Sequence, residues 1–158
     1  AASRWQFMEE LRPSQTGNNT LFVHGSPLDP TFEYVFPDSV RSGWSAERIK
    51  VMFQHAPRLT FCGHSHRTFM IDSDLNCTYP ARDGTVQFLS PERQFILNPG
   101  SVGQPRDGDP RAGYLLYDPD HQRVEWRRVE YDVGAAKRKT EAMCGKDNWC
   151  GVRLEMGR

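Results

Sequence analysis

An apolar, β-prone run that ends in a glycine and two histidines constrains this sequence more than any other feature. The run Arg58-Leu59-Thr60-Phe61-Cys62 predicts a strand, and Gly63-His64-Ser65-His66 follows it directly. We expect Gly63 to provide the backbone freedom for a sharp turn. Loops at strand ends are where open α/β folds place their sites, and neutral imidazole is a common metal ligand. His64 and His66 are therefore candidate metal ligands, and the alternative is that one of them only caps the turn through a backbone hydrogen bond.

A second predicted strand repeats this arrangement. The segment Thr20-Leu21-Phe22-Val23-His24 is apolar and β-prone, and Gly25-Ser26-Pro27 follows it. If the two strands lie side by side, His24 meets His64 and His66. A core histidine at a strand end is the alternative, but the parallel layout favours a ligand.

The rest of the chain favours an α/β (α+β) fold with an antiparallel or mixed sheet. Closely spaced strands cannot all be joined by crossover helices. The further predicted strands are 68–71, 85–89 and 93–97, with a hairpin of 112–118 and 122–131. The predicted helices are the end of one at 5–11, one at 46–55 capped by Ser45, and one at 133–143, while 14–19 and 28–44 are predicted loops. We expect His55 at a helix end, His121 at a solvated hairpin tip, and little chemistry in the tail that ends at Arg158.

A long loop of small and polar residues, 98–111, follows the predicted strand 93–97. A loop of this length with little apolar content is unusual in a compact domain unless it is functional or disordered. Three of its side chains offer neutral hydrogen bonds: Asn98, Ser101 and Gln104. Arg106 and Arg111 have the forked guanidinium that suits phosphate. The favoured alternative for each arginine is ordinary pairing with Asp107 and Asp109.

Composition narrows the function classes. A chain of 158 residues fits one domain, which if complete would bury about 70% of its unfolded surface. Because 20 basic residues balance 20 acidic ones, we expect no general affinity for nucleic acid and no membrane binding. No apolar run approaches the roughly 20 residues of a membrane span, and no secretion signal is visible, so we expect a cytoplasmic protein. The four cysteines form no Cys-x-x-Cys pair and are expected to be free thiols.

Three strand-end motifs occur in a characteristic order: His24-Gly25-Ser26-Pro27, Gly63-His64-Ser65-His66 and the segment 98–106. Together they resemble the calcineurin-like metallophosphoesterase superfamily, and in particular its small bacterial phosphoesterase branch. The likeness extends from about Thr20 to the C-terminus. It implies that residues 1–158 are the C-terminal portion of such a domain, with 1–19 forming a helix end and loop and 20–158 bearing the motifs. The fold implied is a four-layer α/β/β/α sandwich with mixed β-sheets.

The resemblance also implies roles for individual residues. His24 and His64 would bind one ion of a binuclear centre, and His66 would bind the other. The imidazole rings would be oriented by the side chains of Ser26, Ser65 and Asn98. The site would be supported, or the substrate contacted, by Ser101 and Arg106. Two divalent ions about 3.5–4 Å apart would hold a bridging hydroxide that attacks a small phosphomonoester or phosphodiester. The pattern does not distinguish Mn, Fe, Zn, Ni or Mg, and it says nothing about oligomeric state.

The chain departs from the family in its N-terminal motifs. It contains no Asp-x-His and no Gly-Asn-His, and Gly108-Asp109 lies downstream of the histidines, in the wrong order. Three neutral imidazoles cannot neutralise two divalent cations, which normally need carboxylates. We therefore expect this chain to supply only part of the site, with the general acid in the absent N-terminal part.

Two alternatives follow from the same residues. His24, His64 and His66 are a sufficient ligand set for a mononuclear zinc hydrolase with one open position. The second alternative is that the chain is a non-catalytic remnant that acts as a binding module. Its contact surface would then be unpaired strand edges and an apolar patch.

Overall fold

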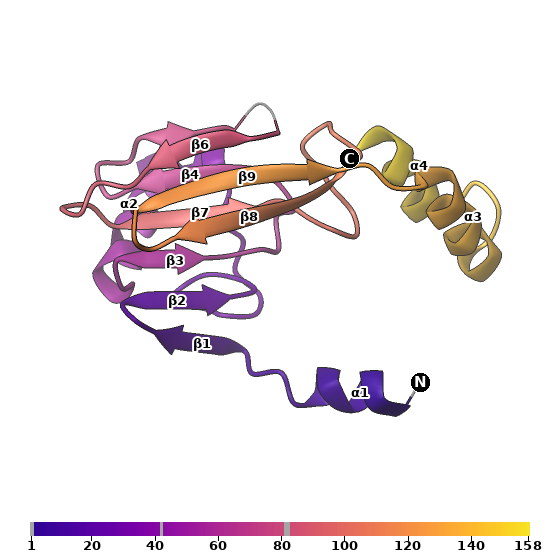
Figure 1. The fold of residues 1–158 in the computed structure, drawn as a ribbon, viewed down its shortest axis with the longest axis horizontal. Coiled ribbons are helices and arrows are strands. Elements are labelled where there is room, and N and C mark those ends of the chain that lie inside the picture. Colours follow the sequence, from indigo (N-terminus) through magenta and orange to yellow (C-terminus); the bar gives the residue numbers. More distant parts are fainter. Residues whose placement is uncertain (1, 42, 81–82) are drawn as a thin grey trace.

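Two β-sheets lie face to face in the computed structural model, which describes residues 2–41, 43–80 and 83–158 (Figure 1). The larger sheet has the strand order β1 (Ser14–Gly17), β2 (Thr20–Val23), β3 (Leu59–Phe61), β7 (Phe95–Pro99), β4 (Thr68–Asp72) and β5 (Cys77–Thr78). The smaller sheet has the order β6 (Thr85–Phe88), β9 (Arg123–Val129) and β8 (Ala112–Asp118). The helices are α1 (Ala2–Glu9), the 3₁₀ helix η1 (Pro37–Arg41), α2 (Gly43–His55), α3 (Val133–Cys144) and α4 (Trp149–Met156).

The larger sheet is mixed and the smaller sheet is antiparallel, which confirms the expectation of antiparallel or mixed pairing; of the mixed sheets that the resemblance implies, only the larger one is mixed. Its central strands β2, β3 and β7 are parallel, whereas β1 pairs antiparallel with β2, and β4 pairs antiparallel with β7 and β5. Because β2 and β3 are parallel neighbours, the loops that follow them leave the same edge of the sheet. This edge carries the two histidine motifs.

Side chains alternate across the larger sheet and build a core on each face. The core between the sheet and α2 consists of Val35, Ile49, Met52, Phe53, Cys62, Phe69, Ile71 and Ile96. The core between the two sheets consists of Leu59, Met70, Leu89, Phe95, Leu97, Val124 and Trp126. Strands β4 and β7 are thus buried on both faces, and the loops at their ends start from well-packed positions.

Two local predictions were wrong. Residues 14–17 form strand β1 and not a loop, because Asn18 and Asn19, with φ of 49° and 58°, make the left-handed two-residue turn of a hairpin. Helix α2 begins at Gly43, so Ser45 lies in its first turn and is not its cap.

Helix α4 was not predicted. The Asn148 side chain caps its start by accepting a hydrogen bond from the Cys150 amide (2.9 Å), and Gly157 ends it in the left-handed conformation. The Gly157 carbonyl accepts from the Gly108 amide (2.9 Å), and a Cβ on Gly157 would approach the Asp109 backbone to 2.7 Å. The end of α4 is therefore docked on the 98–111 loop.

The terminal helices lie outside the sheets. Helices α3 and α4 pack against each other beyond the edge toward which β2 and β3 point, and α1 stands apart from both sheets (Figure 1). None of the helices that the structure describes is both long enough and apolar enough to cross a membrane.

Candidate functional site

His24 and His64 meet at the ends of β2 and β3. Phe22 of β2 pairs with Phe61 of β3, and two residues further along the Gly63 amide donates to the His24 carbonyl (3.0 Å). This register places His24 Nε2 2.8 Å from His64 Nδ1. The predicted meeting of these two rings, which are 40 residues apart in the chain, is confirmed.

The turn that carries the histidines has an unusual backbone. His64 and His66 both adopt a positive φ, 58° and 57°, whereas Gly63 does not. The prediction that Gly63 provides the special conformation of the turn was therefore wrong. Non-glycine residues adopt this region at a cost, and such positions cluster at functional sites.

Asn98 holds this turn in place from the neighbouring strand β7. Its fully buried amide nitrogen donates to the Gly63 carbonyl (2.7 Å) and the Ser65 hydroxyl (3.1 Å). Its amide oxygen accepts from the Gly100 amide (2.9 Å). A single side chain thus ties the histidine turn to the start of the 98–111 loop.

The ring of His64 is held by the loop between β2 and α2. Its Nε2 lies 3.2 Å from the Phe32 carbonyl, and Tyr34 stacks on the ring with centroids 3.6 Å apart. When Nε2–H donates to Phe32, Nδ1 carries no proton and is the acceptor of the contact with His24 Nε2. Burial, and secondarily the charge of His24, lowers the pKa of His64 below its ordinary value. The ring is thus biased toward the neutral form that a ligand requires.

His66 is oriented by the 98–111 loop. Its Nδ1 donates to the Gln104 carbonyl (2.7 Å), which leaves Nε2 without a proton in the neutral ring. The Arg106 amide donates back to the His66 carbonyl (3.0 Å). Burial is the main cause of a lowered pKa for His66, and the positive charges of Arg106 and Arg153 add to it. Both guanidinium groups are therefore close enough to affect this ring.

The predicted supporting serines hold loops together. The buried Ser26 hydroxyl donates to the Glu33 carboxylate and accepts from the amides of Leu28 (3.0 Å) and Asp29 (3.1 Å). The Ser101 hydroxyl accepts from the Gln104 amide (3.0 Å). The direct partners of the imidazoles are the Phe32 and Gln104 carbonyls and the Tyr34 ring. A backbone carbonyl has no sequence signal, so these partners were not identifiable from the sequence.

The two loop arginines have different partners. Arg111 forms a two-point pair with Asp109, with Nε to Oδ1 at 3.0 Å and Nη2 to Oδ2 at 2.7 Å, which confirms ordinary pairing for this residue. Arg106 instead donates to the Gln104 side-chain oxygen (2.9 Å). Asp107 is bound by Arg128. Arg106 has no carboxylate partner in the described part of the chain, so its charge is available to an anion.

The donor geometry fits a metal in part. Two imidazole nitrogens at about 2.0–2.1 Å from one ion lie about 2.9–3.3 Å apart, so the 2.8 Å separation between His24 and His64 needs only a small opening. Within residues 2–41, 43–80 and 83–158, no group of three His, Cys, Asp or Glu side chains is placed to hold an ion. The described structure therefore presents two converging imidazole nitrogens, of His24 and His64, and an additional, separately oriented His66.

The remaining histidines lie outside this site, as predicted. His55 is the last residue of α2, with Nδ1 2.9 Å from the Val51 carbonyl. His121 sits in the turn of the β8–β9 hairpin and pairs with Asp118. Neither can serve the site at the strand ends.

Comparison with known proteins identifies a similar structure of known class. No family model matches the chain. The crystal structure of a metallophosphoesterase from Sphaerobacter thermophilus superposes with a TM-score of 0.85 and 33% identity, over 100% of this chain and 62% of that one. A hypothetical protein from Pyrococcus horikoshii shares the fold, with a TM-score of 0.64 and 16% identity over 97% of this chain and 54% of that one.

A sequence relative also matches nearly all of this chain and only part of its own length. An uncharacterized protein of Methanocaldococcus jannaschii is 35% identical over 143 residues, which are 90% of this chain and 53% of the relative. The chain thus spans about half the length of the curated relative it matches. Its mixed six-stranded sheet and small antiparallel sheet correspond to part of a metallophosphoesterase fold.

Proposed function

We propose that this chain provides part of the active site of a metal-dependent phosphoesterase that hydrolyses a small phosphomonoester or phosphodiester. The observation that carries the proposal is the convergence of His24 Nε2 and His64 Nδ1, 2.8 Å apart, at the ends of adjacent parallel strands. Its support is the similarity of the fold to part of a metallophosphoesterase.

In this proposal His24 and His64 bind one divalent cation and His66 binds a second. Bound cations would polarise the phosphate and activate a water molecule near neutral pH. The Phe32 and Gln104 carbonyls keep the rings in the tautomers that expose His64 Nδ1 and His66 Nε2. Arg106, without a carboxylate partner in the described chain, attracts the negatively charged phosphate.

We further propose that residues 1–158 are the C-terminal portion of a four-layer α/β/β/α domain, and that a segment outside this chain supplies the carboxylate ligands and the general acid. One supporting observation is an uncovered apolar surface beside the site. Phe22 is 49% exposed and stacks on Phe61 with centroids 5.1 Å apart. Both line an apolar pocket of about 390 Å³ that also includes Val102 and Tyr114.

The test is metal content and turnover of the full-length protein that contains this chain. We expect co-purified divalent metal and hydrolysis of nitrophenyl phosphate or bis-nitrophenyl phosphate. His64→Ala should lower metal content and reduce turnover by at least about 100-fold, since even residues that only support a ligand can account for that much. The matched control is His121→Ala, which removes a histidine at the tip of a hairpin and should change neither quantity.

Two results would overturn the proposal. One is a metal-loaded, folded protein that hydrolyses neither compound. The other is a His64→Ala variant with the metal content and turnover of the unmodified protein. A folded protein free of metal, with its apolar surface engaged by another protein, would support the binding-module alternative.

A further inference from the structure

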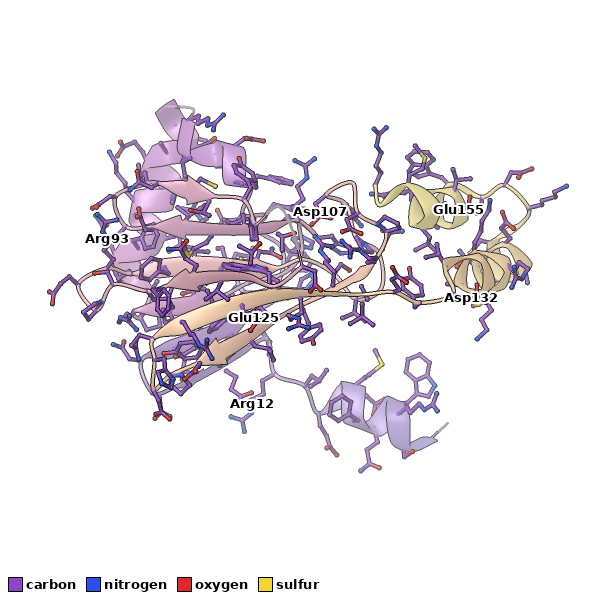
Figure 2. The ribbon with its side chains drawn as sticks, turned by 45° about the horizontal axis from the view of Figure 1, so that its top comes forward. Arg12, Arg93, Asp107, Glu125, Asp132 and Glu155 are labelled. Atoms are coloured by element: carbon purple, nitrogen blue, oxygen red, sulfur yellow. The ribbon has the colours of Figure 1, made fainter. Side chains whose placement is uncertain are left out.

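A pocket of about 730 Å³ lies beside the histidine turn. It is lined by Ser65, which separates the two histidines of the turn, and by Tyr34, which stacks on His64. Its far side is formed by Trp149 and Arg153 of α4. The pocket therefore extends from the candidate catalytic site to the C-terminal helix. In Figure 2, Asp107, another lining residue, lies on the 98–111 loop between the sheets and α4.

The pocket wall is rich in uncompensated positive charge. Arg67, Arg106 and Arg153 line it, and no Asp or Glu side chain lies within 4.0 Å of any of these guanidinium groups in the described part of the chain. Arg153 Nε donates to the Arg158 main-chain oxygen (2.5 Å), and the rest of its guanidinium group stays available. The acidic side chain among the described lining residues is Asp107, which is already paired with Arg128. Three guanidinium groups without an acidic side-chain partner around one cavity favour a ligand with more than one phosphate group.

Flat aromatic surfaces line the same cavity. Tyr34 and Phe36 stack nearly parallel, with an interplanar angle of 3° and centroids 5.2 Å apart. Trp149 is 59% exposed, and the Arg153 guanidinium lies 5.8 Å from its ring centroid. Exposed aromatic faces beside arginines are the usual platform for a heterocyclic base. The cavity is also in the size range of sites for organic ligands, well beyond the needs of a lone phosphate.

We propose that this pocket binds the leaving portion of the substrate, and that this portion is a nucleotide with two or more phosphate groups. The inference rests on the proposed function, because it takes the phosphate to be cleaved as lying at His64 and His66. The base stacks on the aromatic wall, and the remaining phosphates meet Arg67, Arg106 and Arg153. Helix α4 then determines which substrates fit.

The test is calorimetric titration of the full-length protein, in a buffer with chelator, using ADP, adenosine and inorganic pyrophosphate as probes. We expect ADP to bind at least about tenfold more tightly than either of the others, because it alone engages both the rings and the arginines. Trp149→Ala and Arg153→Ala should each weaken ADP binding at least about fivefold. Arg67→Ala, on a different segment, should do the same and guards against misfolding of α4.

The matched control is Arg138→Ala on α3, an exposed arginine outside the pocket, which should leave ADP binding unchanged. The inference is overturned if ADP binds no more tightly than pyrophosphate or adenosine. It is equally overturned if neither Arg67→Ala nor Arg153→Ala weakens ADP binding.

Turnover of nitrophenyl phosphate separates this inference from the proposed function. Hydrolysis that depends on His64, without ADP binding, overturns the nucleotide pocket alone. ADP binding that depends on Trp149 and Arg153, in a metal-loaded protein without hydrolysis, overturns the proposed function and the leaving-group role. Hydrolysis together with such binding supports both.

Discussion

The 98–111 loop is polar but well anchored, whereas none of the described side chains of helices α1 and α3 is buried in a core. The loop is rich in Gly, Pro and charged residues, yet it is held at two points by hydrogen bonds to the histidine turn and to strand β4. Asn98 is fully buried, and Asp107 accepts hydrogen bonds from the Thr68 amide (3.2 Å), the Thr68 hydroxyl and Arg128. In contrast, residues 3–17, which include most of α1, are exposed throughout, and α3 has no buried residue.

The difference shows that partners for polar groups, and not apolar content, fix the segments around this site. The hydrogen bonds of Asn98 and Asp107 described above include bonds to the Gly63 carbonyl and to the Arg128 guanidinium, whose side chain is only 8% exposed, so they satisfy polar groups that have little access to water. The apolar side chains of α1, such as Trp5 and Phe7, find no core within the described chain. Exposed apolar side chains of this kind are typical of surfaces that contact another segment or a partner.

The largest expected contrast is in thiol reactivity. Burial raises the pKa of Cys62, next to the histidine turn, from 9.0 to about 12. The thiolate fraction at pH 8 is then lowered by about 1,000-fold relative to an ordinary thiol, so we expect Cys62 to react with a thiol reagent only on unfolding. Cys144, at the end of α3, and Cys150, in α4, are both exposed and should react at once. Reagent uptake by the folded protein, with Cys144→Ser and Cys150→Ser to assign the fast phase, measures the difference.

The pH dependence of this contrast has a definite sign. The folded state keeps the Cys62 proton between pH 9 and about 12, while the unfolded state loses it. The contribution of this thiol to stability therefore falls as the pH rises through that range. Equal reaction rates for Cys62 and Cys144 at pH 8 would show that the histidine turn opens freely, which would remove the contrast.

The second expected effect is on stability. Asp107→Ala leaves Arg128, which is only 8% exposed, without its close carboxylate partner, and we expect a loss of about 3 kcal/mol in the free energy of unfolding. Asp74→Ala is the control, because Asp74 is 57% exposed in its pair with Arg93 and should contribute about 1 kcal/mol or less. Urea unfolding measures both. Equal losses would mean that the loop is not anchored through Asp107.

The smallest expected effect is in α1. Replacing Trp5 and Phe7 together by Ser should change the free energy of unfolding of this chain by less than about 0.5 kcal/mol, because both side chains are exposed. Self-association should decrease in sedimentation velocity, since an apolar patch is removed. Arg4→Ser, on the same helix, is the control and should leave association unchanged. A large loss of stability would show that α1 packs onto the sheets in solution, in conflict with the contrast drawn here.

Much of the strand-end site was predictable because it depends on residues close together in the chain. Apolar runs followed by His24 and by the Gly63–His66 turn predicted two strands that deliver histidines to one edge, and the 2.8 Å approach of His24 to His64 confirms it. The hairpin at Asn18 and Asn19 was missed although its signal, two adjacent asparagines, is local. Helix α4 was missed because its apolar pattern is weak.

The sequence by itself determined most of the strands and the positions of the histidines at their ends, since alternation and turn residues act over a few neighbours. Only the tertiary structure decided how the imidazoles are oriented and what surrounds them. The Phe32 and Gln104 carbonyls hold the rings across 32 and 38 residues, and Arg153 reaches the same pocket from α4. Carbonyl groups are identical in every residue, and contacts over such separations depend on how the strands and helices pack.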